Sequence, residues 1–333
     1  RRRRTFSLHL LAGLWAITAT VLCAANVLAA SADNGATCLD LLATGQSALG
    51  RGDVKLADRC FGEALLAAEK LGKEDKHVAM ALNDLALTTA TNPDKTVAKK
   101  DKLNKAIAYQ KRSIGIEEKV YGAESENVAF DLHNLGVWYG LNQQFKEGEA
   151  ALRRAAKIRE KRFGKNSDRL GVTLGSLASN LRNQKRYAEA TVLLQRAADI
   201  YKETDRATAA GKLAPHALER SRVLNGLADI DKEQDNFQQA LLILTEVLDL
   251  REKIFGQDSL LVAETLHNMG TCQIKLGKNA EALALLKRAL TIIKKGHAPE
   301  ISAAVTETKK RAELNLARKT GGEKAPPSKG GGH

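Results

Sequence analysis

A short helical phrase of apolar and small residues recurs along the chain. It reads Leu-X-X-Leu-small, or once Leu-X-X-Met-Gly, and it begins at Leu82, Leu132, Leu174, Leu224 and Leu266. The successive spacings are 50, 42, 50 and 42 residues. Because residues three and four apart share one helix face, each phrase predicts a helix that buries a leucine stripe beside a small contact position. Recurrence at this period predicts an array of stacked helical repeats.

A second series of residues follows each phrase and predicts a partner helix. It begins with a small residue, at Ala57, Ala106, Gly148, Ala190, Ala240 and Ala282. Four positions later comes a bulky residue, at Phe61, Leu152, Leu194, Leu244 and Leu286, with Gln110 as the exception. A mostly small position follows three residues after that. Small, bulky and small residues on one face are typical of two packed helices, and Gly45, Ala57, Phe61 and Ala64 mark the first pair at 36–75.

Three of the second helices end on related sequences. These are Ile-Glu-Glu-Lys-Val-Tyr-Gly at 116–122, Ile-Arg-Glu-Lys-Arg-Phe-Gly at 158–164 and Leu-Arg-Glu-Lys-Ile-Phe-Gly at 250–256. Together with the small and bulky positions, they resemble the tetratricopeptide repeat in the longer-period variety typified by kinesin light chain. The resemblance covers about residues 36 to 295. It implies an all-α fold, a right-handed superhelical solenoid of about six antiparallel helix pairs.

Two repeats are longer than the others, for different reasons. In the second, the extra residues lie inside the hairpin, where Asn92-Pro93-Asp94 predicts the start of a loop. In the fourth, they follow the second helix, and Glu203 to His216 are expected to form a long connection. After the sixth repeat, Pro299 is expected to begin a capping helix that runs to about Arg318. Residues 33–318 are thus expected to fold, and 319–333 to form a disordered tail.

The first 32 residues differ from the rest. Four arginines precede an apolar run from Leu10 to Val21, and Ala30-Ser31-Ala32 follows. This order is typical of a secretory signal peptide cleaved after Ala32. The alternative is a retained membrane anchor, formed by residues 5–30, because the apolar character continues far enough to span a bilayer. Either interpretation places the folded part outside the cytoplasm, in the periplasm or the extracellular space.

The basic charge indicates solvated helix faces more than a nucleic-acid surface. The formal net charge is +13, from 52 Lys and Arg against 39 Asp and Glu, but the charges are spread along the chain and alternate in sign. No stacking aromatics accompany the basic runs, so no nucleic-acid partner is expected. A basic adaptor that binds an anionic envelope polymer or a membrane surface is the alternative to a protein-binding scaffold.

Candidate chemistry is sparse. The cysteines that follow the N-terminal segment are Cys38, Cys60 and Cys272, which could form a Cys38–Cys60 bridge or remain buried thiols. No cysteine and histidine cluster has the spacing of metal ligands, so no metal or cofactor is expected. Gly277-Lys278 is followed by Asn279 rather than Ser or Thr, and Ser176 lies within a helical phrase. We therefore do not expect an enzyme.

The resemblance also implies where a ligand would bind. In this family the first helices line a concave groove, and the residue after the opening leucine of the phrase faces it: Asn83, His133, Gly175, Asn225 and His267. Further groove positions would be Phe130, Arg182, Arg222, Asp229 and Lys232. Asn and His offer donors and acceptors that suit an extended peptide backbone. The alternative is that the Asn side chains bond to neighbouring helices.

Overall fold

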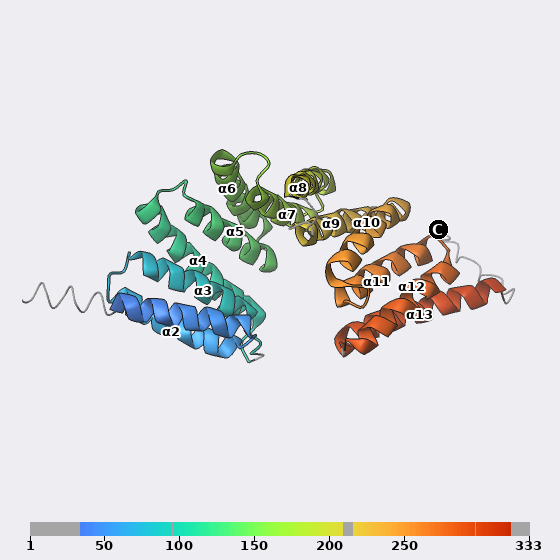
Figure 1. The fold of residues 1–333 in the computed structure, drawn as a ribbon, viewed down its shortest axis with the longest axis horizontal. Coiled ribbons are helices and arrows are strands. Elements are labelled where there is room, and N and C mark those ends of the chain that lie inside the picture. The colour runs from blue at the N-terminus through green and yellow to red at the C-terminus, as the bar shows by residue number, and fades with distance from the viewer. Residues whose placement is uncertain (1–33, 95, 209–215, 297, 321–333) are drawn as a thin grey trace, which may run out of the picture. The chain divides into compact units, whose positions relative to one another are not determined.

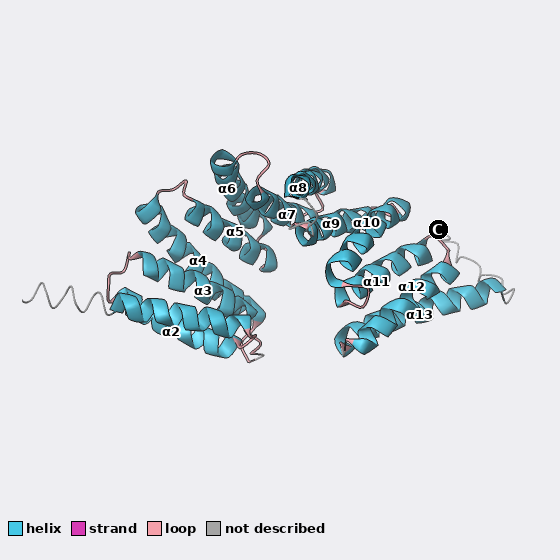
Figure 2. Cartoon of the chain, in the orientation of Figure 1, coloured by secondary structure: helices cyan, strands magenta, loops and turns pink. Residues whose placement is uncertain are grey.

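The computed structural model describes residues 34–94, 96–208, 216–296 and 298–320. The predicted signal peptide or anchor and nearly all of the predicted tail lie outside these residues. Within the described ranges the chain is helical and has no strand (Figure 2). None of the helices described is both long and apolar enough to cross a membrane. The chain divides into two compact units, residues 1–158 and 159–333.

Helix pairs follow one another along the chain (Figure 1). The first pair consists of residues 34–50 and α2 (Val54–Glu69). The next are α3 (Lys76–Thr91) with α4 (Lys99–Tyr121), α5 (Glu126–Leu141) with α6 (Phe145–Phe163), α7 (Asp168–Asn183) with α8 (Tyr187–Thr208), α9 (Ala217–Glu233) with α10 (Phe237–Phe255), and α11 (Leu260–Lys275) with α12 (Asn279–Lys295). Helix α13 (Pro299–Thr320) packs on α12 and α11. The predicted all-α solenoid with its capping helix is confirmed, and we number its repeats one to six.

A close contact between a glycine of the first helix and a bulky residue, or wedge, of the second joins three of the pairs. A Cβ added to Gly45 would lie 2.4 Å from the Phe61 ring, and one added to Gly136 would lie 2.4 Å from Cγ of Leu152. In the second unit, a Cβ on Gly270 would lie 2.8 Å from Leu286. These distances leave no space for a side chain. The bulky residue therefore fills the volume that the small residue vacates, as close packing requires.

Gln110 takes the wedge position in the second repeat and is fully buried. Its Nε2 donates to Oδ1 of Asn83 over 3.1 Å, and its Oε1 accepts from Nε1 of Trp138 over 3.4 Å. Asn134 also donates to the same Asn83 oxygen, over 3.1 Å. The exception is thus a hydrogen-bonded wedge that joins α3, α4 and α5, and burying it is tolerated because its polar atoms are paired.

Turns between repeats use a common arrangement of Gly and Ser. Gly122, Gly164 and Gly256 have positive φ of 87°, 85° and 78° directly after α4, α6 and α10. Three residues later, Ser125, Ser167 and Ser259 accept a hydrogen bond from a backbone N–H of the next helix, each over 3.3 Å. A left-handed glycine followed by a serine N-cap ends one helix and starts the next. Helix α9 lacks this arrangement, since its N-cap His216 makes no side-chain capping bond.

Ion pairs link the second helices of successive repeats. The pairs are Arg112–Glu69, Arg154–Glu118, Arg196–Glu160 and Arg288–Glu252, with N···O distances of 2.7, 2.6, 2.6 and 2.5 Å. Between α8 and α10, Lys202 and Glu246 occupy these places, so the order of the charges is reversed, and Glu246 pairs with Arg220 instead. Each exposed pair contributes at most about 1 kcal/mol.

Several predicted details were tested by the structure. In the second repeat, residues 92–94 and 96–98 are not helical, which confirms the predicted interruption of the hairpin. The capping helix ends at Thr320, two residues beyond the predicted end. The expectation that residues 203–216 form a connection is wrong for 203–208, which continue α8 because Asp205 at its end is buried. Of the two alternatives for the cysteines, the structure shows buried thiols, because Cys38, Cys60 and Cys272 are all free and buried.

Replacing Gly136 by Ala should lower the free energy of unfolding by about 1–3 kcal/mol, because the new Cβ would overlap Leu152 and overpacking carries that penalty. Gly115→Ala is the matched control. Gly115 lies within α4 with nothing within 4 Å of an added Cβ, so helix propensity should raise stability by about 1 kcal/mol. Chemical denaturation measures both changes, and a Gly136→Ala protein as stable as the wild type would contradict the wedge.

Candidate functional site

Buried arginines join successive repeats in the second unit. Arg159, which is 4 % exposed, donates from Nη1 to Oγ1 of Thr173 over 2.8 Å and to the Arg169 carbonyl over 3.2 Å. Arg251 is equally buried and repeats the arrangement with Oγ1 of Thr265 and the Leu261 carbonyl, both over 2.9 Å. We call the contact between one repeat's second helix and the next repeat's first helix a joint. Two joints are thus fastened by an arginine and a threonine.

The joint between the fourth and fifth repeats departs from this arrangement. Tyr201 stands in the place of the arginine, and Val223 stands in the place of the threonine. The ring of Tyr201 packs beneath Gly171, where an added Cβ would lie 3.0 Å from Cζ, and it stacks on His216 with ring centroids 5.9 Å apart. Burial raises the pKa of the Tyr201 hydroxyl, and the nearby Glu219 and Asp168 raise it further. The hydroxyl therefore keeps its proton at neutral pH.

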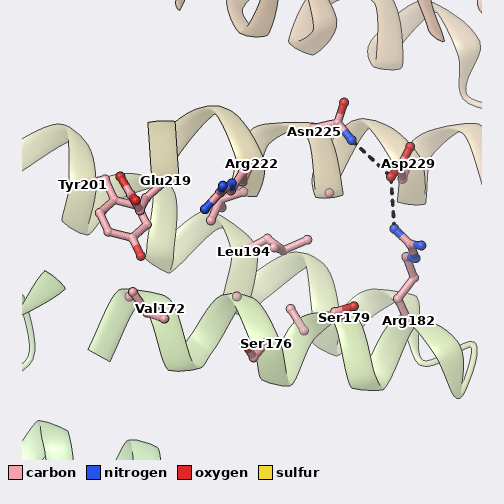
Figure 3. A pocket seen from close by; sticks show the side chains of 15 residues that line it. Val172, Ser176, Ser179, Arg182, Leu194, Tyr201, Glu219, Arg222, Asn225 and Asp229 are labelled. Carbon is pink, nitrogen blue, oxygen red and sulfur yellow. Dashed lines mark hydrogen bonds and ion pairs between the residues drawn. The ribbon is translucent and has the colours of Figure 1, made fainter. Parts of the chain in front are cut away.

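A pocket of about 480 Å³ opens at this joint. Helices α7 and α9 form its two walls, and Leu194 and Tyr201 of α8 form its floor (Figure 3). Small residues of α7 leave it open: Gly171, Gly175, Ser176, Ala178 and Ser179. Val172, Leu194 and Val223 make part of the lining apolar. An apolar pocket of this size, with a few polar groups at its rim, is typical of a ligand site.

One end of the pocket is a paired polar network centred on Asp229. Its Oδ2 accepts from Nη1 of Arg182 over 3.2 Å and from Nδ2 of Asn225 over 3.3 Å, as the dashed lines of Figure 3 show. Its Oδ1 lies 2.8 Å from Nζ of Lys232, which also donates to Asn268. The network ties α7 to α9 and leaves little uncompensated charge at this end.

Arg222 lies at the other end of the pocket, on the wall formed by α9. Its side chain is exposed, and it makes no hydrogen bond or ion pair with any residue in the described part of the chain. Figure 3 shows the guanidinium on the Tyr201 side of the pocket. A guanidinium presents five N–H donors and no acceptor. Arg222 can therefore offer several hydrogen bonds to a carboxylate or carbonyl group in the pocket.

The pocket brings together several residues that the sequence predicted for the groove. Arg182, Arg222, Asn225, Asp229 and Gly175 all line it. Lys232 is connected to it through Asp229. The sequence predicted these residues as a set because they lie at comparable positions of successive first helices.

The remaining predicted groove residues lie elsewhere. In the second unit, Nε2 of His267 is 2.9 Å from Oγ1 of Thr308 in the capping helix, and burial, followed by Lys232, lowers the pKa of His267. In the first unit, Phe130 is exposed, His133 is half-buried, and Asn83 belongs to the network around Gln110. At Asn83, therefore, the structure shows the alternative in which the Asn side chain bonds to neighbouring helices.

Sequence reasoning missed Tyr201, Leu194 and Glu219 as pocket residues. A signal for Tyr201 was present, because the second helices that carry Ile158-Arg159 and Leu250-Arg251 carry Ile200-Tyr201 at the same register. At this position two repeats have a buried arginine and the fourth has a tyrosine. Of these three joints, the one with the tyrosine therefore cannot form the hydrogen bonds between arginine and threonine. Comparing the register of the second helices would have found it.

Comparison with known proteins gives the family of these repeats. A family model described as tetratricopeptide repeat matches residues 132–203 and 215–295. These two segments of the chain are tetratricopeptide repeats. The two matched segments are separated by the end of α8 and part of the connection to α9, where the repeat is longest. No curated protein matches the sequence.

Solved structures share the tetratricopeptide-repeat fold at low sequence identity. Nearly identical TPR-like repeats of a putative kinesin light chain from Podosopora anserina are 19 % identical, cover 68 % of this chain and 99 % of their own, and give a TM-score of 0.54. BtubC (BKLC) from P. vanneervenii is 13 % identical, with 84 % and 97 % covered and a TM-score of 0.55. A Rap protein complexed with Competence and Sporulation Factor is 12 % identical, with 85 % and 76 % covered and a TM-score of 0.54.

Replacing Arg251 by Leu should lower the free energy of unfolding by about 3–5 kcal/mol, the loss typical of removing one partner from a buried charged network. Thr265 and the Leu261 carbonyl would lose their donor. Arg222→Leu makes the same chemical change at an exposed position and should alter stability by less than about 0.5 kcal/mol. Equal effects of the two substitutions in denaturant titrations would show that the buried arginine does not fasten its joint.

Proposed function

We propose that this protein is a non-catalytic scaffold that binds a protein or peptide segment along its first helices, with the pocket between α7 and α9 as a principal contact. The observation that carries the proposal is the position of Arg222 in the pocket. An arginine without an internal partner lies on the wall of an apolar pocket, at the joint where the buried arginine of other joints is missing. The fold supports an interaction role, and the pocket supports a particular place for it.

The lining of the pocket suits one part of an extended polypeptide. An apolar side chain of the ligand would pack on Leu194, Val172 and Val223, where it replaces water against apolar surface. A carboxylate or carbonyl of the same segment would accept hydrogen bonds from Arg222. Because Gly175 has no side chain, the ligand can approach the α7 backbone closely at that position. Affinity would come from several such contacts along the groove rather than from this pocket alone.

Related structures support a binding role at the level of the fold. One Rap protein of similar fold is described as complexed with Competence and Sporulation Factor. We infer a comparable use of the fold here. The alternative role, a basic adaptor for anionic polymers or membranes, has less support, because four exposed arginines of the second helices are paired with glutamates of the preceding second helix.

We further propose that the protein works outside the cytoplasm. The support is the order of residues 1–32, in which arginines, an apolar run and Ala30-Ser31-Ala32 follow one another. Expression of the full chain, followed by fractionation and N-terminal sequencing, tests this. A mature N-terminus at Asp33 in the exported fraction is expected. An intact N-terminus in the membrane fraction would favour the anchor, and an intact chain in the cytoplasm would contradict export.

Filling the pocket, or reversing the charge on its wall, should weaken binding of the partner. Gly175→Leu would occupy the space between α7 and α9, and its Cβ would make an ordinary 3.7 Å contact with Val223, so the fold should tolerate it. Arg222→Glu would reverse the charge on the wall. Each should weaken binding by about tenfold or more, which corresponds to losing about 1.4 kcal/mol of contact energy.

The measurement is crosslinked affinity capture from the native envelope fraction in low and high salt. Lys310→Glu is the matched control, since it makes the same charge change as Arg222→Glu on the exposed face of α13. A protein captured in high salt by the wild type and by Lys310→Glu, but not by the pocket variants, supports the proposal. Capture that survives both pocket variants and disappears in high salt would favour the polyanion adaptor.

A further inference from the structure

The joint between the second and third repeats is built from carboxyl groups. At the register of Thr173 and Thr265 it carries Asp131, and at the register of Arg159 and Arg251 it carries Glu117. Asp131 is 4 % exposed and Glu117 is 6 % exposed. Two acidic residues thus replace the arginine and threonine of the other joints. Burying two carboxylates side by side is costly unless at least one is protonated.

Hydrogen bonding around Ser113 points to the protonated residue. The Ser113 Oγ lies 3.0 Å from the Ala79 carbonyl oxygen of α3 and 2.5 Å from Oδ2 of Asp131 in α5. A carbonyl oxygen can only accept, and a hydroxyl has one hydrogen to donate. If Ser113 donates to Ala79, the short contact with Asp131 is a hydrogen bond only when Asp131 supplies the hydrogen. Both contacts are satisfied at once by a carboxylic acid at position 131.

The groups that act on Asp131 favour its neutral form. They are Asp84 from α3 and Glu117, Gln110 and Ser113 from α4, and none of these is a cation. Helix α6 contributes the apolar Ala155 and Ile158 to the same core. Burial is the largest influence and, with Glu117 and Asp84, raises the pKa of Asp131 to about 7. Hydrogen bonds that Ser113 and Gln110 would donate to the carboxylate form oppose this shift. Burial also raises the pKa of Glu117, against its hydrogen bond from Asn127.

We propose that Asp131 is a pH-sensitive latch between the second and third repeats. As a carboxylic acid it donates to Ser113 and fastens α5 to α4 and α3. As a carboxylate it places an uncompensated charge beside Glu117 and loosens the joint. The predicted groove residue Asn83 bonds to Asn134 across this joint, so loosening α5 would change the groove surface of the first unit. The proposal is independent of the pocket in the second unit.

The sign of the pH effect follows from proton binding. The folded protein binds a proton at Asp131 with a pKa of about 7, whereas an unfolded aspartate has a pKa of about 4. Between these values the folded state holds more protons than the unfolded state, so stability falls as pH rises. This contribution is complete below the unfolded pKa and lost above the folded one.

Titration of the Asp131 carboxyl carbon by NMR in the wild-type protein tests the latch directly. A midpoint near 7 is expected. In Glu117→Gln the midpoint should move to lower pH, because a neighbouring negative charge is removed. Hydrogen exchange of the α5 amides, corrected for intrinsic rates, should be faster at pH 8 than at pH 5.5 by about tenfold or more, an effect expected when a joint opens locally.

Two substitutions complete the test. Asp131→Asn keeps the shape of the side chain and removes the titration, and Asp131→Thr introduces the residue that the chain uses at positions 173 and 265. Both should abolish the excess α5 exchange at pH 8, and if Asp131→Asn does not fold, Asp131→Thr still serves. A wild-type midpoint near 4, or α5 exchange with the same pH dependence in the folded variants, would overturn the latch.

Discussion

The two helices of a repeat approach closely because one of them carries only a small residue at the point of contact. In three repeats that residue is Gly45, Gly136 or Gly270, and Phe61, Leu152 and Leu286 occupy the space they leave. Since this contact recurs with little variation, the geometry inside a repeat is nearly constant. The interior of a repeat therefore has little freedom to change, and differences between repeats accumulate where one repeat meets the next.

Equivalent positions at the joints carry residues of very different chemistry. An arginine and a threonine fasten two joints in the second unit, at Arg159 and Arg251. Where Tyr201 and Val223 stand instead, a pocket opens, and in the first unit Asp131 and Glu117 place a titratable group in the core. A repeat protein can thus carry distinct chemistry at each joint without changing the fold, because each joint contacts only its neighbours.

The fold could be predicted because its packing is local and periodic: the leucine phrases and wedge positions are close in sequence to what they contact. Predictions were less accurate where the conformation or role of a residue is determined by contacts with the next repeat. The end of α8 was placed too early because Asp205, near that end, accepts a bond from the His216 backbone eleven positions away. Five pocket residues were predicted from the family resemblance. Tyr201 was missed, because its importance appears only when it is compared with the arginines at the same position of other repeats. Asn83 was assigned to the groove, although its hydrogen bonds are to Gln110 and Asn134.

The reversed charges at Lys202 and Glu246 bear on the order in which repeats can be assembled. If every second helix carried the same Arg and Glu, any repeat could stack on any other, and a growing chain could skip or exchange neighbours. A fifth repeat with Glu246 in place of the arginine would meet like charge if it stacked on a helix ending in Glu118, Glu160 or Glu252. Beside Lys202 of the fourth repeat the same glutamate meets no like charge, and it pairs with Arg220 of its own repeat. A surface charge that contributes little to stability can still favour the correct order of stacking among similar repeats.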